Sequence, residues 1–224
     1  MTKVPYNKGD AYEANIFKML ESLGLIPEGT KRAGAGAGAD MPFLHNGKIF
    51  NLEVKKDLQA DFGQKYFKWN KNNGWSWALN DQVTNFYTQL GVLTILNNKS
   101  IIPNKLNKPD KQITIKDKKE DQKNFEDKID VPIQALYEYY KSKKCFYIQI
   151  GKGFGFYHLE KDIANLGTPQ FNAEIKLRFR AKTIHSEPVY NYRFLVAIKI
   201  KLKTDKSCFN LETTNTQRFP PIKP

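Results

Sequence analysis

The chain is poor in cysteine and has no long apolar run. Only Cys145 and Cys208 occur among its 224 residues, and they lie far apart without the spacing of a zinc site. Two free thiols in a reducing compartment are expected, and a single disulfide stays open. No apolar run is long enough to span a bilayer, and the N-terminal MTKVPYNKGD lacks the apolar core of a signal peptide. These absences predict a cytoplasmic protein without membrane contact.

Acidic residues are also in short supply. The 36 Lys and Arg residues outnumber the 23 Asp and Glu residues, giving a formal net charge of +13. A basic surplus favours a polyanionic partner such as nucleic acid, because binding phosphates releases counterions. An AT-rich coding sequence would also enrich Lys, Asn and Ile, so the placement of charge is more informative than its sum. The 3 histidines share no local spacing, which disfavours a ββα-metal nuclease.

A β-hairpin is predicted between Asp40 and Lys55. Asn46-Gly47 is the preferred dipeptide for a two-residue type I′ turn, and counting outward from it places Asp40 opposite Glu53. Directly opposed residues share a face of the sheet, and Lys55, two residues beyond Glu53, points the same way. Two adjacent carboxylates repel each other, and a divalent cation between them would relieve that cost. The pattern predicts a metal-dependent hydrolytic site.

The residues before the hairpin add further candidates. An amphipathic helix is predicted over residues 10–23, with Glu13 at the margin of its apolar stripe. There Glu13 either faces the site or simply pairs with a nearby lysine. Lys31 and Arg32 then precede an alternating Gly/Ala run over residues 33–39, whose small side chains let a backbone pass close to a phosphate chain.

This order of elements resembles the core of the PD-(D/E)xK nuclease superfamily, especially that of archaeal Holliday-junction resolvases. In that core a helix carrying a glutamate, a Gly/Ser-rich loop and a hairpin bearing Asp and then Glu-x-Lys follow one another. The matching run is NKGDAYEANIFKMLESLGLIPEGTKRAGAGAGADMPFLHNGKIFNLEVKKD. The resemblance implies that Asp40 and Glu53 bind Mg²⁺, that Lys55 positions or activates the attacking water, and that Glu13 assists the metal site. The proline that often precedes the family's first Asp is replaced by Ala39.

The remainder of the chain resembles no family, and its pattern is mixed. A helix running into a buried strand is expected over residues 81–96, and a second short helix over residues 131–141. Trp75 and Trp77 either stack on bases or anchor a loop, and the core role is expected. Strands are expected at residues 145–150, 154–159, 174–184 and 192–203. The predicted organisation is a nuclease core over residues 1–96, a flexible lysine-rich insertion over 97–128, a β-rich DNA-contacting part over 129–203 and an irregular tail over 204–224.

The strand predicted at residues 174–184 carries basic side chains at four consecutive outward positions. Such a row would repel itself without a polyanion, which predicts a DNA contact surface. Lysines that protect a half-exposed sheet from edge pairing are the competing interpretation. The predicted nucleic-acid-binding residues are Lys31, Arg32, Lys56, Lys176, Arg178, Arg180 and Lys182.

The sequence therefore predicts an α/β protein with a restriction-endonuclease-like mixed central sheet flanked by helices, extended by a C-terminal β-rich region. The predicted function is a Mg²⁺-dependent endonuclease acting on double-stranded DNA. A type II restriction endonuclease is favoured because the chain beyond the core far exceeds what a minimal resolvase needs. A palindromic target would require a homodimer. A junction resolvase or other structure-specific nuclease, and a DNA-binding module without catalysis, are the alternatives, and an RNA substrate stays open.

Overall fold

The chain forms two compact units. The computed structural model describes residues 8–32, 39–184 and 188–224. Unit 1 contains Met1–Ala60, Pro132–Ile175 and Ile200–Pro224, and unit 2 contains Asp61–Val131 and Lys176–Lys199. This division differs from the predicted one, because the chain leaves unit 1 directly after the hairpin and returns to it at Pro132. The protein is mixed α/β, as expected, and its strands form two sheets where one central sheet was expected.

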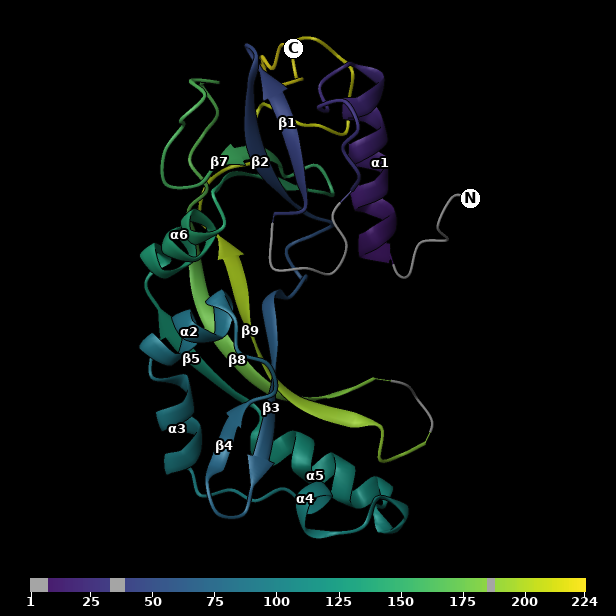
Figure 1. Ribbon diagram of the computed structural model, residues 1–224, viewed down its shortest axis with the longest axis vertical. Coiled ribbons are helices and arrows are strands. Elements are labelled where there is room, and N and C mark those ends of the chain that lie inside the picture. Colours follow the sequence, from purple (N-terminus) through teal and green to yellow (C-terminus); the bar gives the residue numbers. More distant parts are fainter. Residues whose placement is uncertain (1–7, 33–38, 185–187) are drawn as a thin grey trace. The chain divides into compact units, whose positions relative to one another are not determined.

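Unit 1 contains a four-stranded mixed sheet in the order β1-β2-β6-β7. β1 and β2 are antiparallel, β2 and β6 are parallel, and β6 and β7 are antiparallel. Helix α1 lies beside the β1-β2 hairpin in Figure 1 and contacts β2. The elements are α1 (Lys8–Ser22), β1 (Met41–His45), β2 (Lys48–Lys55), α6 (Ile133–Ser142), β6 (Cys145–Ile150) and β7 (Gly155–His158).

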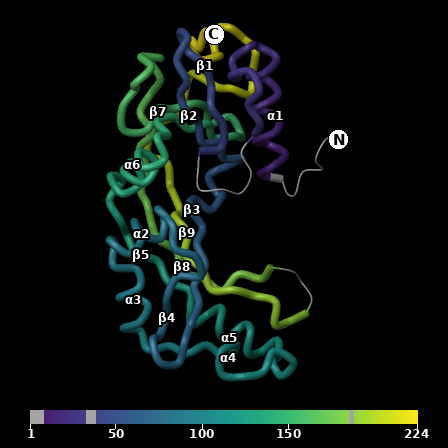
Figure 2. The backbone as a smooth tube through the Cα atoms, viewed as in Figure 1, coloured from purple at the N-terminus to yellow at the C-terminus, as the bar shows by residue number. Residues whose placement is uncertain are grey.

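Unit 2 contains most of a five-stranded sheet in the order β4-β3-β9-β8-β5, with helices connecting its strands. The long strands β8 and β9 each begin in one unit and end in the other, and Figure 2 allows both to be followed along the chain. The elements are β3 (Phe62–Asn70), β4 (Gly74–Trp77), α2 (Gln82–Gln89), α3 (Val92–Asn98), α4 (Asn104–Asn107), the 3₁₀ helix η1 (Asp110–Gln112), α5 (Ile115–Phe125), β5 (Asp127–Val131), β8 (Ala173–Thr183) and β9 (Tyr192–Leu202).

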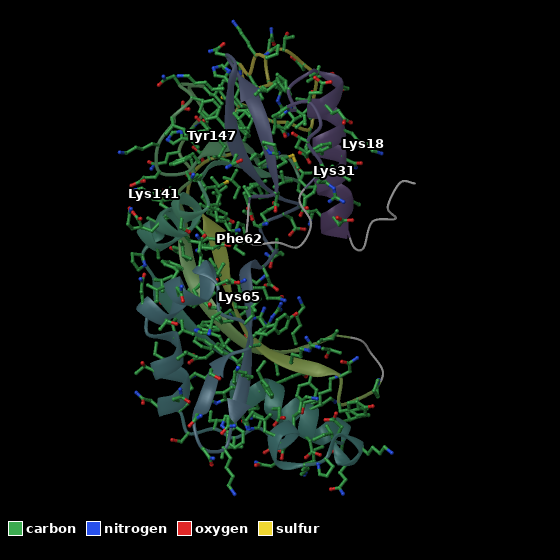
Figure 3. All side chains as sticks on the ribbon, viewed as in Figure 1. Lys18, Lys31, Phe62, Lys65, Lys141 and Tyr147 are labelled. Atoms are coloured by element: carbon green, nitrogen blue, oxygen red, sulfur yellow. The ribbon has the colours of Figure 1, made fainter. Side chains whose placement is uncertain are left out.

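The core of unit 1 packs the apolar stripe of α1 against the sheet. Ile16 and Leu20 from the helix are buried with Leu52 of β2 and Tyr147 of β6, the last labelled in Figure 3. The tail after β9 contains no helix or strand, as predicted. It nevertheless contributes Leu211 to the same core, so the tail is an irregular but packed segment.

The core of unit 2 is aromatic. Trp75 and Trp77 are 4% and 5% exposed, so the prediction that they belong to the core is confirmed. The ring of Phe67 stacks on Trp77 with centroids 4.8 Å apart, and Trp75 lies 5.2 Å from Phe125. Aromatic pairs of this kind contribute beyond the area they bury.

Two secondary-structure predictions for unit 2 were wrong. Residues 97–128 contain α4, η1 and α5 in place of the expected loop, and residues 81–96 form two helices with no strand between them. A capping box of Thr114 with Asp117 begins α5, and one of Asp81 with Thr84 begins α2. The helix α3 that replaces the expected strand follows Gly91, which makes no side-chain cap. No helix in the described part of the chain has the length and apolar character needed to cross a membrane.

Candidate active site

The predicted hairpin has the predicted register. Asn46 and Gly47 have φ values of +48° and +71°, as a type I′ turn requires. Phe43 pairs with Phe50 and Met41 with Leu52, so Asp40, one residue before β1, lies at the level of Glu53. Local turn chemistry therefore sets which side chains meet at this end of β2.

Three predicted residues, Asp40, Glu53 and Lys55, come together and form what we call the carboxylate–lysine cluster. The Lys55 ammonium group forms ion pairs with Glu53 Oε1 and, at 3.5 Å, with Asp40 Oδ2. The same Asp40 oxygen accepts a hydrogen bond of 2.8 Å from the backbone N–H of Val54. Glu53 is only 3% exposed, so the cluster is largely shielded from water.

Burial and mutual charge perturb this cluster. Burial raises the pKa of Asp40, the neighbouring Glu53 charge adds to that effect, and the Lys55 ammonium group opposes it. Burial alone would lower the pKa of Lys55, but the Glu53 and Asp40 carboxylates outweigh it and the pKa is raised. Lys55 is therefore a cation at neutral pH. It is suited to stabilising negative charge and not to abstracting a proton.

Glu13 lies on α1, where the charges of the carboxylate–lysine cluster affect its pKa, but its ion-pair partner is Arg32. Burial, followed by the charge of Asp40, raises the pKa of Glu13 to about 7 against the opposing effects of Lys55 and Arg32. The guanidinium of Arg32 contacts Glu13 at 3.4 Å and Asp10 at 2.5 Å. Both interpretations of Glu13 thus have support, since it is near the cluster and also forms an ion pair.

A tyrosine that the sequence analysis missed completes the cluster. The hydroxyl of Tyr140, on α6, donates a hydrogen bond of 3.1 Å to Glu53 Oε1. Its side chain is fully buried, and burial raises the pKa of the hydroxyl well above its ordinary value, so it stays a donor. Lys143, which follows the same helix, lies over the rings of Tyr139 and Tyr140, and its charge lowers the pKa of Asp40. Nothing in the local sequence around α6 indicated this role.

The donor set suits a small divalent cation. Glu53 Oε2 is buried and has no hydrogen-bond partner among the described residues, while Oε1 is held by Tyr140 and Lys55. An unsatisfied buried carboxylate oxygen is costly, and a cation bound there would remove that cost. No group of three or more His, Cys, Asp or Glu side chains is placed to hold a metal within residues 8–32, 39–184 and 188–224. Two carboxylates still match Mg²⁺, which commonly takes its remaining ligands from water and substrate phosphates.

The four basic side chains of the β8 row are paired with three acids from elsewhere in unit 2. All four side chains form ion pairs: Lys176 with Asp130 at 2.9 Å, Arg178 with Glu126 at 2.6 Å, and both Arg180 and Lys182 with Asp61. These pairs reduce the self-repulsion expected of the row within the protein, with Asp61 shared by Arg180, Lys182 and Lys199. DNA contact by this row stays a prediction.

The other predicted DNA-binding residues lie around the cluster in unit 1. Lys31 is exposed, Arg32 is engaged by acids of α1, and Lys56 is half-buried at the end of β2. The Gly/Ala run expected to approach a phosphate chain falls, over residues 33–38, outside the described residues.

No family model, curated protein or solved structure matches the chain. The carboxylate–lysine cluster is therefore the feature of the described residues that indicates a function.

Proposed function

We propose that the protein is a Mg²⁺-dependent endonuclease that hydrolyses phosphodiester bonds in double-stranded DNA, with a restriction-endonuclease-like nuclease core in unit 1. The observation that carries the proposal is the carboxylate–lysine cluster, in which Glu53 Oε2 is buried without a partner beside Asp40 and Lys55. A mixed sheet with α1 against one hairpin supports it, because this is the type of core that the resemblance implies.

Each residue has a distinct task in this proposal. Asp40 and Glu53 would hold Mg²⁺, which when bound supplies charge neutralisation at the scissile phosphate and a more acidic water. Lys55 remains protonated and stabilises the negative charge that develops on the phosphate or on the attacking oxygen. The Val54 N–H orients Asp40, and the Tyr140 hydroxyl orients Glu53.

A type II restriction endonuclease is the favoured subclass. Unit 2 has its own aromatic core and most of a second sheet, which is more than a cleavage site needs. We assign to it contacts that select the DNA sequence. A palindromic target would be bound by a homodimer, because the symmetry of the protein then matches that of the site.

The test is cleavage of long duplex DNA in the presence of Mg²⁺ or EDTA. Wild type is expected to give discrete fragments with Mg²⁺ and none with EDTA, and Asp40→Asn is expected to give none in either. Asp57→Asn is the matched control, because this carboxylate follows β2 closely but pairs with Lys152 at 3.1 Å, outside the cluster. It should cleave like wild type.

The other outcomes separate the alternatives. Cleavage confined to four-way junctions or other branched DNA would replace the restriction assignment with a structure-specific nuclease. Duplex binding without cleavage of any linear or branched DNA, or of RNA, would contradict the nuclease proposal and leave a DNA-binding module.

A further inference from the structure

Helix α5 buries acidic side chains on its inner face and exposes lysines on its outer face. Its sequence IKDKKEDQKNF is close to balanced, which taken alone indicates a solvated helix. Asp117 is 7% exposed, pairs with Lys108 at 2.7 Å and accepts the N–H of Thr114. The Lys108 ammonium group and the Thr114 hydrogen bonds lower the pKa of Asp117 to about 2. The negative charge of Asp117 is therefore balanced by Lys108 within unit 2.

The second inward acid of α5 is Asp121, which is 2% exposed. Its carboxylate accepts hydrogen bonds from the backbone N–H groups of Asn104 and Lys105, at 2.7 and 3.0 Å, and from the Tyr192 hydroxyl at 2.7 Å. These contacts tie α5 to α4, which lies beside it in Figure 1, and to β9. Two of the three acids of the helix are therefore unavailable to balance charge on its outer surface.

Three of the four lysines of α5 lie on that outer surface, and the fourth, Lys118, is half-buried. Lys116, Lys119 and Lys123 are exposed and surround one shallow depression. Their spacing of three and four residues places them on one face, along about 10 Å of helix axis at 1.5 Å per residue. Among the described residues, none of the three ammonium groups has a carboxylate at ion-pair distance. Glu120 is the acid on this face, so the face is net positive.

Many other basic side chains of unit 2, including those of the β8 row, are matched by acids, whereas Lys68, Lys71, Lys111 and Lys128 are exposed single lysines outside the α5 face. The pairs are Lys65 with Asp81, Lys99 with Asp127, Lys108 with Asp117, Lys176 with Asp130, Arg178 with Glu126, and Arg180 with Asp61. A paired cation must lose its partner before it binds a phosphate, whereas an exposed, unpaired lysine releases phosphate counterions without that cost.

We propose that the outer face of α5, formed by Lys116, Lys119 and Lys123, contacts the phosphate backbone of the bound DNA. The inference rests on the proposed function and adds to it the surface of unit 2 that meets the substrate. The 10 Å row matches about three base-pair steps of one strand at 3.4 Å each. Lysine contacts with phosphates fix position without reading bases, so this face sets affinity and register.

The test is the salt dependence of duplex binding, measured with full-length protein that carries Asp40→Asn to keep the DNA intact. The α5 variant adds Lys116→Gln, Lys119→Gln and Lys123→Gln. The matched control adds Lys18→Gln, Lys48→Gln and Lys161→Gln, which are exposed lysines of unit 1, so both variants lose three charges. Circular dichroism verifies that all proteins fold.

The α5 variant should bind more weakly at low salt, and its slope of log K against log[salt] should be smaller in magnitude by about 2.7, that is 0.9 for each of three phosphates. The control should retain the slope of the parent. Equal slopes for the α5 variant and the control would overturn the inference while the proposed function stands. A parent protein that binds neither duplex nor branched DNA at low salt would overturn the proposed function and this inference together.

Discussion

Replacing Tyr140 by Phe removes one hydroxyl and tests whether α6 positions Glu53, the carboxylate proposed to bind Mg²⁺. That hydroxyl donates to Glu53 Oε1 at 3.1 Å from a fully buried side chain. A hydrogen bond to a charged acceptor contributes about 1.5–3 kcal/mol to stability. For a chain of this length each kcal/mol shifts the melting temperature by about 2–4 °C. Stability alone, however, would not distinguish a structural from a positioning role.

The same helix provides the control. The hydroxyl of Tyr137 donates at 2.6 Å to the carbonyl oxygen of Phe171, and the side chain is 6% exposed. Tyr137→Phe thus removes a similarly buried hydrogen bond that does not touch the carboxylate–lysine cluster. Both variants should melt earlier than wild type.

Only Tyr140→Phe should weaken Mg²⁺ binding. Groups that orient a metal ligand typically change metal affinity by about 10–100-fold when removed. Isothermal titration calorimetry with Mg²⁺ measures the affinity directly, and the cleavage rate at limiting Mg²⁺ gives an independent readout. An equal change in Mg²⁺ affinity for Tyr140→Phe and Tyr137→Phe would refute the positioning role of Tyr140.

Two further substitutions probe the charged groups of the two units. Lys55→Met leaves Asp40 and Glu53 without their ammonium partner, so it should lower stability in EDTA by about 3 kcal/mol and abolish cleavage in Mg²⁺. Its melting temperature should rise more on addition of Mg²⁺ than that of wild type. Identical melting of variant and wild type in EDTA would contradict this. Burial would raise the pKa of Asp61, but the hydrogen bond from Lys199 and the charge of Arg180 outweigh it, and the pKa is lowered. Asp61 therefore stabilises the fold at pH values above the ordinary Asp pKa of about 3.9. This contribution to stability is lost as the pH falls through the lowered pKa of the folded protein. Asp61→Asn should therefore lower the urea midpoint at pH 7 and converge on wild type in acid; a deficit that persists unchanged in acid would refute that assignment.

The hairpin end of the site was predictable because its determinants are local. The Asn46-Gly47 turn sets the register of the strands, and the register alone brings Asp40 to Glu53. Alternation then places Lys55 on the same face. None of these steps needs a contact with a distant part of the chain.

Tyr140 could not be predicted in the same way. It lies 87 residues after Glu53, and the parallel pairing of β2 with β6 is what makes α6 a neighbour of the hairpin. Within the sequence of α6 it is one of several apolar or aromatic residues of a buried stripe. Only the tertiary arrangement separates it from Tyr137.

Charge placement was the least predictable feature. The β8 row reads as a free basic surface until Asp61, Glu126 and Asp130 are placed beside it. Conversely, α5 reads as balanced until Asp117 and Asp121 are seen to be buried. In both cases the deciding contacts come from other elements of the fold. The order of charged residues in the sequence alone therefore does not show which face of unit 2 carries the excess positive charge.

The dependence of the DNA cleavage rate on Mg²⁺ concentration, compared between wild type and Glu53→Gln, tests the central claim most directly. Glu53 carries the buried Oε2 that has no partner among the described residues, and Gln keeps its shape while removing its charge. We expect wild-type cleavage to rise with Mg²⁺ to saturation, and Glu53→Gln to show no cleavage or to require much higher Mg²⁺. Cleavage that persists in EDTA, or a Glu53→Gln protein with the wild-type Mg²⁺ dependence, would contradict the assignment of this cluster as the metal-dependent active site.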